Sequence, residues 1–233
     1  MKVAVGIVGG ELARYAIFYD SLMHVEGVTH QNVIQARGAN VAENRNGIAE
    51  RALSMGYDAI WHVDDDQVFA PDTLNRLIAH DKDIMSGLYL ARQPPFIPQL
   101  YDQENARGDC HPRLLRANDR GVVKCLAVGA GCLLVKAEVY RKLDKPWWQL
   151  GQINKENLSD DLNFCHRVRQ KGFDIWCDQS ILVGHHMSGT LWPVYKNDRS
   201  WGTVLVYGRE AIAEWPPAQK NPAAKECSRR TPD

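Results

Sequence analysis

Apolar runs alternate with amphipathic stretches along the first ninety residues of the chain. The runs at 2–10, 28–38, 57–66 and 83–92 predict four strands, most of which end in glycine or charged residues. Between them, apolar positions at helical spacing predict helices at 13–23 and 39–55 and a third helix that Pro71 opens. Such alternation indicates parallel βαβ units, and we therefore expect an α/β fold with a mostly parallel central sheet and helices on both faces.

The second part of the chain is less regular. Residues 93–120 lack periodicity and are rich in proline, arginine, aspartate and asparagine, which predicts a long irregular segment. Two strand-like runs and a short helix follow at 122–143, and a further helix begins at Ser159. A strand-like run at 173–186 ends in two histidines. We expect one domain over 1–215 and a flexible polar tail over 216–233.

Composition narrows the classes of function. The 28 Lys and Arg residues equal the 28 Asp and Glu residues, which disfavours a broad nucleic-acid-binding surface. The longest strongly apolar stretch, 125–135, is far shorter than the ~20 residues that a membrane span needs. No signal-peptide pattern opens the chain. We therefore expect a protein without a membrane span.

The cysteines point to a reducing compartment. There are six, and none form a C-x-x-C pair. This usage favours reduced thiols, and so we expect a cytoplasmic protein. A zinc site at Cys110 and His111 is disfavoured because partners at zinc-finger spacing are missing.

Three consecutive aspartates, Asp64, Asp65 and Asp66, follow the third predicted strand. Side chains alternate along a strand, so we expect Asp64 and Asp66 to point to one side and Asp65 to the other. Two converging carboxylates favour Mg²⁺ or Mn²⁺, which relieves their repulsion and keeps positions open for substrate phosphates. The alternative is a solvated turn. Ligands bind beyond the carboxyl ends of such strands, where Arg37 and Arg92 are also expected, and this favours a site.

The helix at 39–55 carries a charged residue at an apolar position. Its apolar stripe includes Ile48 and Ala52, and Arg45 falls on the same line. Near the start of the helix, Arg45 could reach a phosphate or carboxylate at the strand ends. Alternatively, it pairs with Glu43 or Glu50 on its own helix.

Two later segments carry further candidates. Asp160 and Asp161 lie in the first turn of a helix, a position that the helix dipole explains by itself. His185 and His186 end the last clear strand, either as metal ligands or as surface residues.

One segment of the chain concentrates basic residues. Residues 107–124, called the basic segment below, carry five Lys and Arg residues against two aspartates. With nearby aromatic residues such as Trp148, these basic residues would suit a polyanionic substrate. Tryptophans at this density also fit the packing of a core.

Five motifs in order resemble the GT-A fold glycosyltransferases of the family 2-like type found in phages and bacteria. The resemblance covers about residues 2–187, and the motifs read "ENRNGIAERALSMGYDAIWHVDDDQVF", "DIMSGLYLARQPPFIP", "VGAGCLLVKAEVYRKL", "SDDLNFCHRVRQKGFDIWCD" and "GHH". The resemblance implies a single GT-A (Rossmann-like) domain. Residues 1–92 would bind a nucleotide sugar, and 93–215 would bind the acceptor.

The resemblance also implies a metal-dependent glycosyltransferase of the hexosyltransferase type. Such an enzyme would move a sugar from a nucleotide diphosphate sugar, here expected to be a UDP-sugar, to an acceptor hydroxyl. Asp64-x-Asp66 would be the DxD motif that holds Mn²⁺ or Mg²⁺, with Asp66 as the most direct ligand and His185 completing the shell. Asp160 stands where the family usually has glutamate. Asp161 would be the general base if the enzyme inverts.

Substrate contacts are implied for a larger set of residues. Those on the donor side are Gly6, Val8, Arg37, Arg45, Asn46, Asp64, Asp65 and Gly131. Those on the acceptor side are Arg92, Trp148 and His186. The acceptor would be a glycan, a lipid-linked sugar or phage DNA with hydroxymethylated bases.

Two other functions stay open. A nucleotidyltransferase that acts on sugar phosphates would also use carboxylate-held Mg²⁺, although "GIVGGELAR" is only a faint version of its glycine-rich phosphate loop. A non-catalytic relic of the fold could bind sugars or nucleic acid without turnover. The joint presence of Asp66, Asp161 and His185 disfavours the relic.

Overall fold

The computed structural model describes residues 1–9, 16–38, 40–92, 95–104, 110–116, 118–153, 156–186, 190–195, 201–207 and 210–215. The tail expected at 216–233 lies outside these residues.

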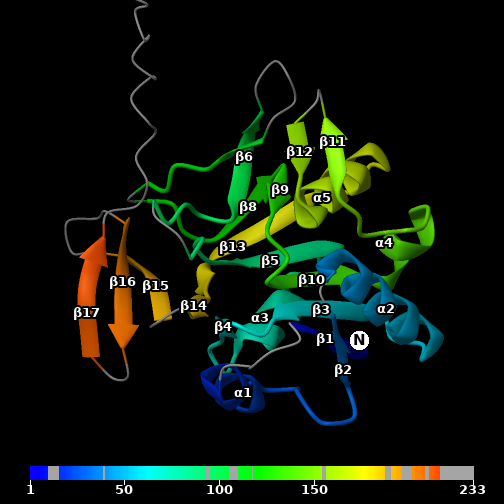
Figure 1. The fold of residues 1–233 in the computed structure, drawn as a ribbon, viewed down its shortest axis with the longest axis horizontal. Helices are drawn as coiled ribbons and strands as arrows, with labels where there is room; N and C mark the ends of the chain where they lie inside the picture. Colours follow the sequence, from blue (N-terminus) through cyan, green and yellow to red (C-terminus); the bar gives the residue numbers. More distant parts are fainter. Residues whose placement is uncertain are drawn as a thin grey trace, which may run out of the picture.

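Within the described chain, seven strands form a central sheet (Figure 1). They are β1 (Val3–Gly9), β2 (Val33–Arg37), β3 (Ala59–Asp64), β5 (Ile84–Leu88), β8 (Val122–Cys125), β10 (Cys132–Lys136) and β13 (Ile175–Leu182). Their order is β2-β1-β3-β10-β5-β13-β8. β10 and β8 run against the other five, which all point the same way. The expectation of an α/β fold with a mostly parallel sheet is confirmed.

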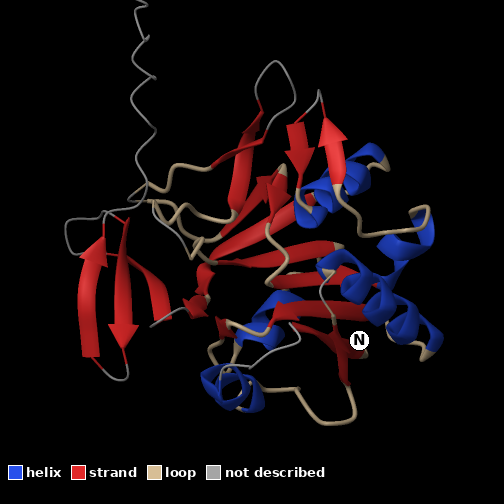
Figure 2. Ribbon diagram, viewed as in Figure 1, coloured by secondary structure: helices blue, strands red, loops and turns tan. Residues whose placement is uncertain are grey.

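Helices cover both faces of this sheet, as expected (Figures 1 and 2). They are α1 (Ala16–Met23), α2 (Val41–Ser54), α3 (Thr73–Ala79), α4 (Ala137–Lys142) and α5 (Asp160–Gln170). Buried residues of α2, α4 and α5 belong to one apolar cluster, and those of α1 and α3 belong to a second cluster on the opposite face. Because both faces are covered, β1 and most of β3 are buried, which explains their nearly continuous apolar sequences.

Short antiparallel strands flank the central sheet. One flanking sheet contains β4 (Gln67–Val68), β14 (Gly184–His186), β15 (Thr190–Tyr195), β16 (Trp201–Tyr207) and β17 (Glu210–Trp215). A second contains β6 (Leu100–Glu104), β7 (Cys110–Pro112) and β9 (Ala127–Val128), and β11 (Gly151–Ile153) pairs with β12 (Glu156–Leu158). The segment expected to be irregular at 93–120 therefore holds β6 and β7, which are too short to show a clear alternation.

Helix α2 begins and ends where its sequence directs. The Asn40 side chain accepts a hydrogen bond from the Glu43 backbone N–H at 3.2 Å, and Gly56 follows the helix with φ +70°. Arg45 is buried on the core-facing side, as its position on the apolar stripe predicted. The packed helix therefore carries a positive charge into the interior next to the ends of β1 and β3.

Gly6 lets α2 pack closely on β1. A Cβ atom at this position would lie 2.5 Å from Cγ2 of Ile48, a β-branched side chain with little freedom to move. We expect Gly6→Ala to lower the free energy of unfolding by about 1–3 kcal/mol, measured by urea denaturation. Gly47 lies in α2, and no atom lies within 4 Å of a Cβ added there. Gly47→Ala should therefore raise the free energy of unfolding by about 0.5–1 kcal/mol. Equal effects of the two changes would contradict this packing.

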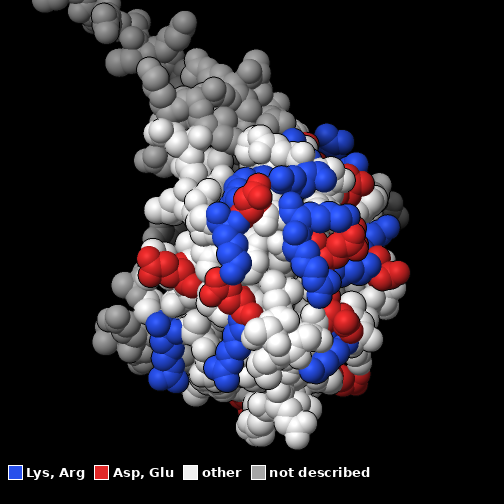
Figure 3. Space-filling view, turned by 90° about the vertical axis from the view of Figure 1, so that its right-hand side faces the viewer, with Lys and Arg blue, Asp and Glu red and all other residues white. Residues whose placement is uncertain are grey.

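The surface carries mixed charge. On the face shown in Figure 3, Lys and Arg side chains lie among Asp and Glu side chains. Exposed ion pairs of this kind join Lys145 to Glu50 at 2.7 Å and Lys142 to Glu138 at 2.6 Å. None of the helices in the described ranges combines the length and the apolar character required to cross a bilayer.

Candidate functional site

The candidate site lies at the carboxyl ends of β1 and β3, near the middle of the sheet. Asp64 is the last residue of β3, and it pairs with Val8 near the end of β1. The chain then turns at Asp65 and Asp66, and the Asp65 N–H donates to the Val8 carbonyl at 3.2 Å. The expected strand alternation therefore stops at Asp64, and the turn sets the directions of Asp65 and Asp66 instead.

Arg45 joins this aspartate segment to the start of α5. Its Nη2 donates to Asp64 Oδ1 at 2.9 Å, and its Nη1 donates to Asp160 Oδ2 at 2.5 Å. The residue is 3% exposed, and its Cζ lies 5.3 Å from the centre of the Trp148 ring. Burial acts to lower the pKa of Arg45, but the charges of Asp64 and Asp160 outweigh it and raise the pKa above its ordinary value. Arg45 thus bridges two carboxylates, and the pairing with Glu43 or Glu50 is not what the structure shows.

Asp66 is the carboxylate that the site keeps ionised. Arg92 Nη1 lies 2.8 Å from its Oδ2, and His185 Nε2 lies 3.4 Å from its Oδ1. Burial acts to raise the pKa of Asp66, but His185 and Arg92 outweigh it and lower the pKa. Burial raises the pKa of Asp64; Arg45 opposes that rise and the charge of Asp66 adds to it. Asp66 is therefore the better charged ligand of the two.

His185 is oriented by its surroundings. Its Nδ1 lies 2.7 Å from the Leu90 carbonyl oxygen, which can only accept, so Nδ1 carries the hydrogen. Nε2 is then the nitrogen that faces Asp66. The ring also packs edge-on against Tyr89, with centroids 5.6 Å apart. A backbone carbonyl on one ring nitrogen is the usual means by which a metal-binding histidine is held in place.

The residues present fit a divalent cation without forming a complete cage. Within the described ranges, no group of three or more His, Cys, Asp or Glu side chains is arranged to hold a metal. Asp66 Oδ1 is nevertheless buried with no hydrogen-bond partner there, and His185 Nε2 points to it. Carboxylate oxygen suits both Mn²⁺ and Mg²⁺, and an imidazole ligand favours Mn²⁺ over the harder Mg²⁺; both ions keep positions for other ligands. Asp64 fits this role less well because Arg45 already holds its Oδ1.

Asp161 lies beside this group at the start of α5. Its Oδ1 accepts hydrogen bonds from the Leu162 backbone N–H at 2.8 Å and from the Ser159 hydroxyl. Its Oδ2 accepts none from the described residues. Its neighbour Asp160 is joined to Asp64 through Arg45, which places Asp161 near the same group. Asp161 therefore has one oxygen fixed and one available.

Three residues expected to touch substrate have structural roles instead. Gly6 lies inside β1 under Ile48 and not at the strand end. Trp148 is 1% exposed and stacks on Phe164 at 4.0 Å, so it cannot contact an acceptor. The Asn46 side chain binds the Trp148 backbone, donating to its carbonyl at 2.7 Å and accepting from its N–H at 3.0 Å. For Gly6 and Trp148 the prediction is corrected because both are buried in packing, and the polar atoms of the Asn46 side chain are engaged by the Trp148 backbone.

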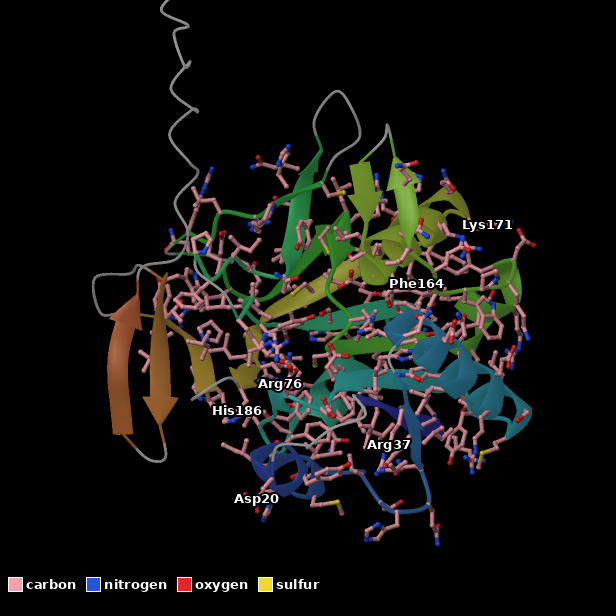
Figure 4. The ribbon with its side chains drawn as sticks, in the orientation of Figure 1. Asp20, Arg37, Arg76, Phe164, Lys171 and His186 are labelled. Carbon is pink, nitrogen blue, oxygen red and sulfur yellow. The ribbon has the colours of Figure 1, made fainter. Side chains whose placement is uncertain are left out.

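The other predicted residues lie at or near the strand ends. The Gly131 carbonyl accepts from the Asp64 N–H at 3.4 Å, and the His186 N–H donates to the Asp66 carbonyl at 2.7 Å. Arg37 is exposed at the end of β2, and His186 is the last residue of β14 (Figure 4). Arg92, expected on the acceptor side, instead lies on Asp66.

Two neighbours of the site were not predicted. The Tyr89 hydroxyl accepts a hydrogen bond from the Gly131 N–H at 3.0 Å. Gln67 is fully buried and pairs with His185 between β4 and β14, and its amide has no hydrogen-bond partner among the described residues. Tyr89 could have been found, because it directly follows β5 at the same edge of the sheet. Gln67 has no such signal, since only the pairing with β14 buries it.

The basic segment is largely bound to the protein itself. Arg113 pairs with Asp102 and Asp119, at 3.0 Å each. Arg120 lies over an aromatic ring of β15 at 3.7 Å. Arg107 lies outside the described residues. Arg120 therefore joins the segment to β15, and Arg113 joins it to β6.

Comparison with known proteins bears on the fold. No family model and no curated protein matches the chain. Among solved structures, the chain is similar to protein A197 from STIV, with a TM-score of 0.61 and 13% identity, over 91% of this chain and 97% of that chain. At this identity the likeness concerns the fold alone, and it agrees with a single Rossmann-like α/β domain.

Proposed function

We propose that the protein is a metal-dependent glycosyltransferase that moves a sugar from a nucleotide diphosphate sugar, UDP-linked in our proposal, to an acceptor hydroxyl. One observation carries this proposal. At the carboxyl edge of the sheet, an ionised Asp66 faces an oriented His185, and Arg45 joins the neighbouring Asp64 to Asp160 at the start of α5. The resemblance of the motifs to GT-A enzymes supports the same function.

Asp66 and His185 would hold the Mn²⁺ or Mg²⁺ ion, with Asp64 beside them. When bound, the metal would offset the negative charge that develops on the departing nucleoside diphosphate. Arg45 would keep Asp64 and Asp160 in fixed positions, because a planar guanidinium can bind two carboxylates at once. Arg37, exposed at the end of β2, would face the nucleoside, whereas Val8 at the neighbouring end of β1 is buried in the core and cannot offer its side chain.

Asp161 would act on the acceptor. Its fixed Oδ1 leaves Oδ2 to take the proton of the attacking hydroxyl. As the acceptor oxygen forms its bond to the anomeric carbon, the bond from that carbon to the diphosphate oxygen breaks. The nucleoside diphosphate then leaves with the electron pair. Attack opposite to the leaving group would invert the anomeric centre.

The acceptor and the compartment are part of the proposal. A glycan, a lipid-linked sugar or a hydroxymethylated DNA base would each supply a hydroxyl. We place the reaction in the cytoplasm because the five described cysteines are free thiols.

A donor screen tests this function directly. Thermal shift with UDP-, GDP-, ADP- and dTDP-sugars should show one donor that raises Tm by about 5–10 °C when Mn²⁺ is present, from about 2–3 kcal/mol of ligand stabilisation. The same donor should be hydrolysed slowly with release of nucleoside diphosphate, and Asp66→Asn should abolish both effects. Asp144→Asn, at an exposed residue, is the matched control.

The rival functions give different products. Pyrophosphate release from a nucleoside triphosphate and a sugar phosphate, without hydrolysis of any nucleotide sugar, would show a nucleotidyltransferase. Sugar or DNA binding that is unchanged in Asp66→Asn, with no turnover in either protein, would show a non-catalytic binding protein.

A further inference from the structure

The two arginines that pair with the site aspartates are held very differently. The Arg45 side chain is 4% exposed, and Asp160 binds it as well as Asp64. The Arg92 side chain is 47% exposed, and Asp66 is its one ion-pair partner among the described residues. Arg45 is thus a fixed part of the site, whereas Arg92 lies across its surface.

Arg92 and a metal ion would compete for the same carboxylate. Asp66 has only two oxygens: Oδ2 is taken by Arg92 at 2.8 Å, and Oδ1 faces His185 at 3.4 Å. A divalent cation held by Asp66 and His185 would lie within a few ångströms of the guanidinium. Like charges at that distance repel strongly where little water enters, and Asp66 itself is only 8% exposed. The two cations would therefore repel each other across Asp66 in this arrangement.

We infer that Arg92 is a placeholder for the metal: it neutralises Asp66 in the ligand-free protein, releases it when the metal binds, and then binds the donor diphosphate. Its exposure leaves the side chain free to turn, and a guanidinium binds phosphate oxygens in pairs. Without it, Asp66 would lie beside Asp64 with His185 as its remaining basic neighbour among the described residues. This inference rests on the proposed function. It assigns Arg92 to the donor, whereas the sequence predicted a contact with the acceptor.

If Arg92 moves from Asp66 to the diphosphate when the metal binds, replacing it should have opposite effects on the affinities for Mn²⁺ and for UDP. The Arg92 side chain is about half exposed, so the loss of its charge should change metal binding only modestly: Arg92→Met should bind Mn²⁺ alone about two- to fivefold more tightly than the unchanged protein. Loss of a charge-assisted contact to phosphate should weaken UDP binding at saturating Mn²⁺ by about tenfold or more. A residue with only a structural role would not change the two affinities in opposite directions.

The experiment measures Mn²⁺ binding by electron paramagnetic resonance and UDP binding by calorimetry. Arg92→Met, Arg92→Lys and Asp66→Asn are compared with the unchanged protein, and Arg51→Met, at an exposed residue of α2, is the matched control. Arg51→Met should leave both affinities unchanged. Arg92→Lys should restore part of the UDP affinity because it keeps the charge. Circular dichroism checks that each variant is folded.

The outcomes separate this inference from the proposed function. Mn²⁺ binding that needs Asp66 but is equal or weaker in Arg92→Met would overturn the placeholder role and leave the metal site standing. Mn²⁺ binding seen only in Arg92→Met would support the placeholder strongly. If no variant binds Mn²⁺ through Asp66 at millimolar concentration, both the inference and the metal-dependent function are overturned.

Discussion

Replacing Arg45 with methionine is expected to lower the free energy of unfolding by about 3 kcal/mol, because the change leaves two carboxylates without their shared cation. Asp160 has a side chain only 13% exposed, so water cannot replace the lost partner well. Asp64, at 32%, is partly resolvated, which keeps the cost at the lower end of the range for buried pairs. For a chain of this length, Tm should fall by about 6–12 °C, measured by calorimetry.

A double-mutant cycle tests the bridge itself. If Arg45 acts by neutralising Asp160, then Asp160→Asn should lower the cost of Arg45→Met, with a coupling of at least about 1 kcal/mol. Arg45→Lys should not restore stability, since a single ammonium cannot bind both carboxylates with the same geometry. Arg51→Met on the exposed side of the same helix should change stability by less than about 0.5 kcal/mol. Additive effects of Arg45→Met and Asp160→Asn would refute the bridge.

Replacing Asp161 with asparagine is expected to slow release of nucleoside diphosphate from the donor by about 10²–10⁴-fold, the usual contribution of a general base. The amide oxygen of asparagine can still accept the hydrogen bond from the Leu162 N–H, so the start of α5 should keep its structure. Binding of Mn²⁺ and UDP should stay within about twofold of the unchanged protein, because neither ligand is expected to contact Asp161. Steady-state kinetics and calorimetry measure the two quantities separately.

Comparison of Asp161→Asn with Asp66→Asn separates loss of the general base from loss of the metal. Asp66→Asn should lose metal binding and turnover together, whereas Asp161→Asn should lose turnover alone. Donor hydrolysis by Asp161→Asn at the rate of the unchanged protein would show that another group accepts the proton. Asp144→Asn, at an aspartate on the surface away from the site, should leave both measurements unchanged.

Much of the central sheet could be predicted because its signals are local. The apolar runs at β1 and β3 are buried on both faces. A nearly continuous apolar run identifies such a strand without knowledge of which strands lie beside it. Arg45 could also be identified from a local signal, because a charged residue on the apolar stripe of a helix needs an oppositely charged partner in the interior. The identity of that partner was not predictable, since Asp160 lies 115 residues away and the pattern of α2 contains nothing that specifies α5.

The wrong predictions have a common physical cause. Gly6 and Trp148 belong to residue types that also occur at sugar sites, but glycine equally permits close packing and tryptophan equally fills a core. Sequence alone does not show which neighbour each one meets. The strands β14 to β17 were missed as a sheet because β4 is only two residues long, and its pairing with β14 is visible only in three dimensions.

The pairing of β4 with β14 also has a consequence for the order of folding. The hydrogen bond from the His186 N–H to the Asp66 carbonyl joins segments more than a hundred residues apart, and His185 reaches Asp66 only through that contact. Such distant contacts form late, because a long loop must close before they stabilise the chain. We therefore expect the ability to bind Mn²⁺ to appear after most helical circular dichroism during refolding, so that the ion would mark the last stage of assembly.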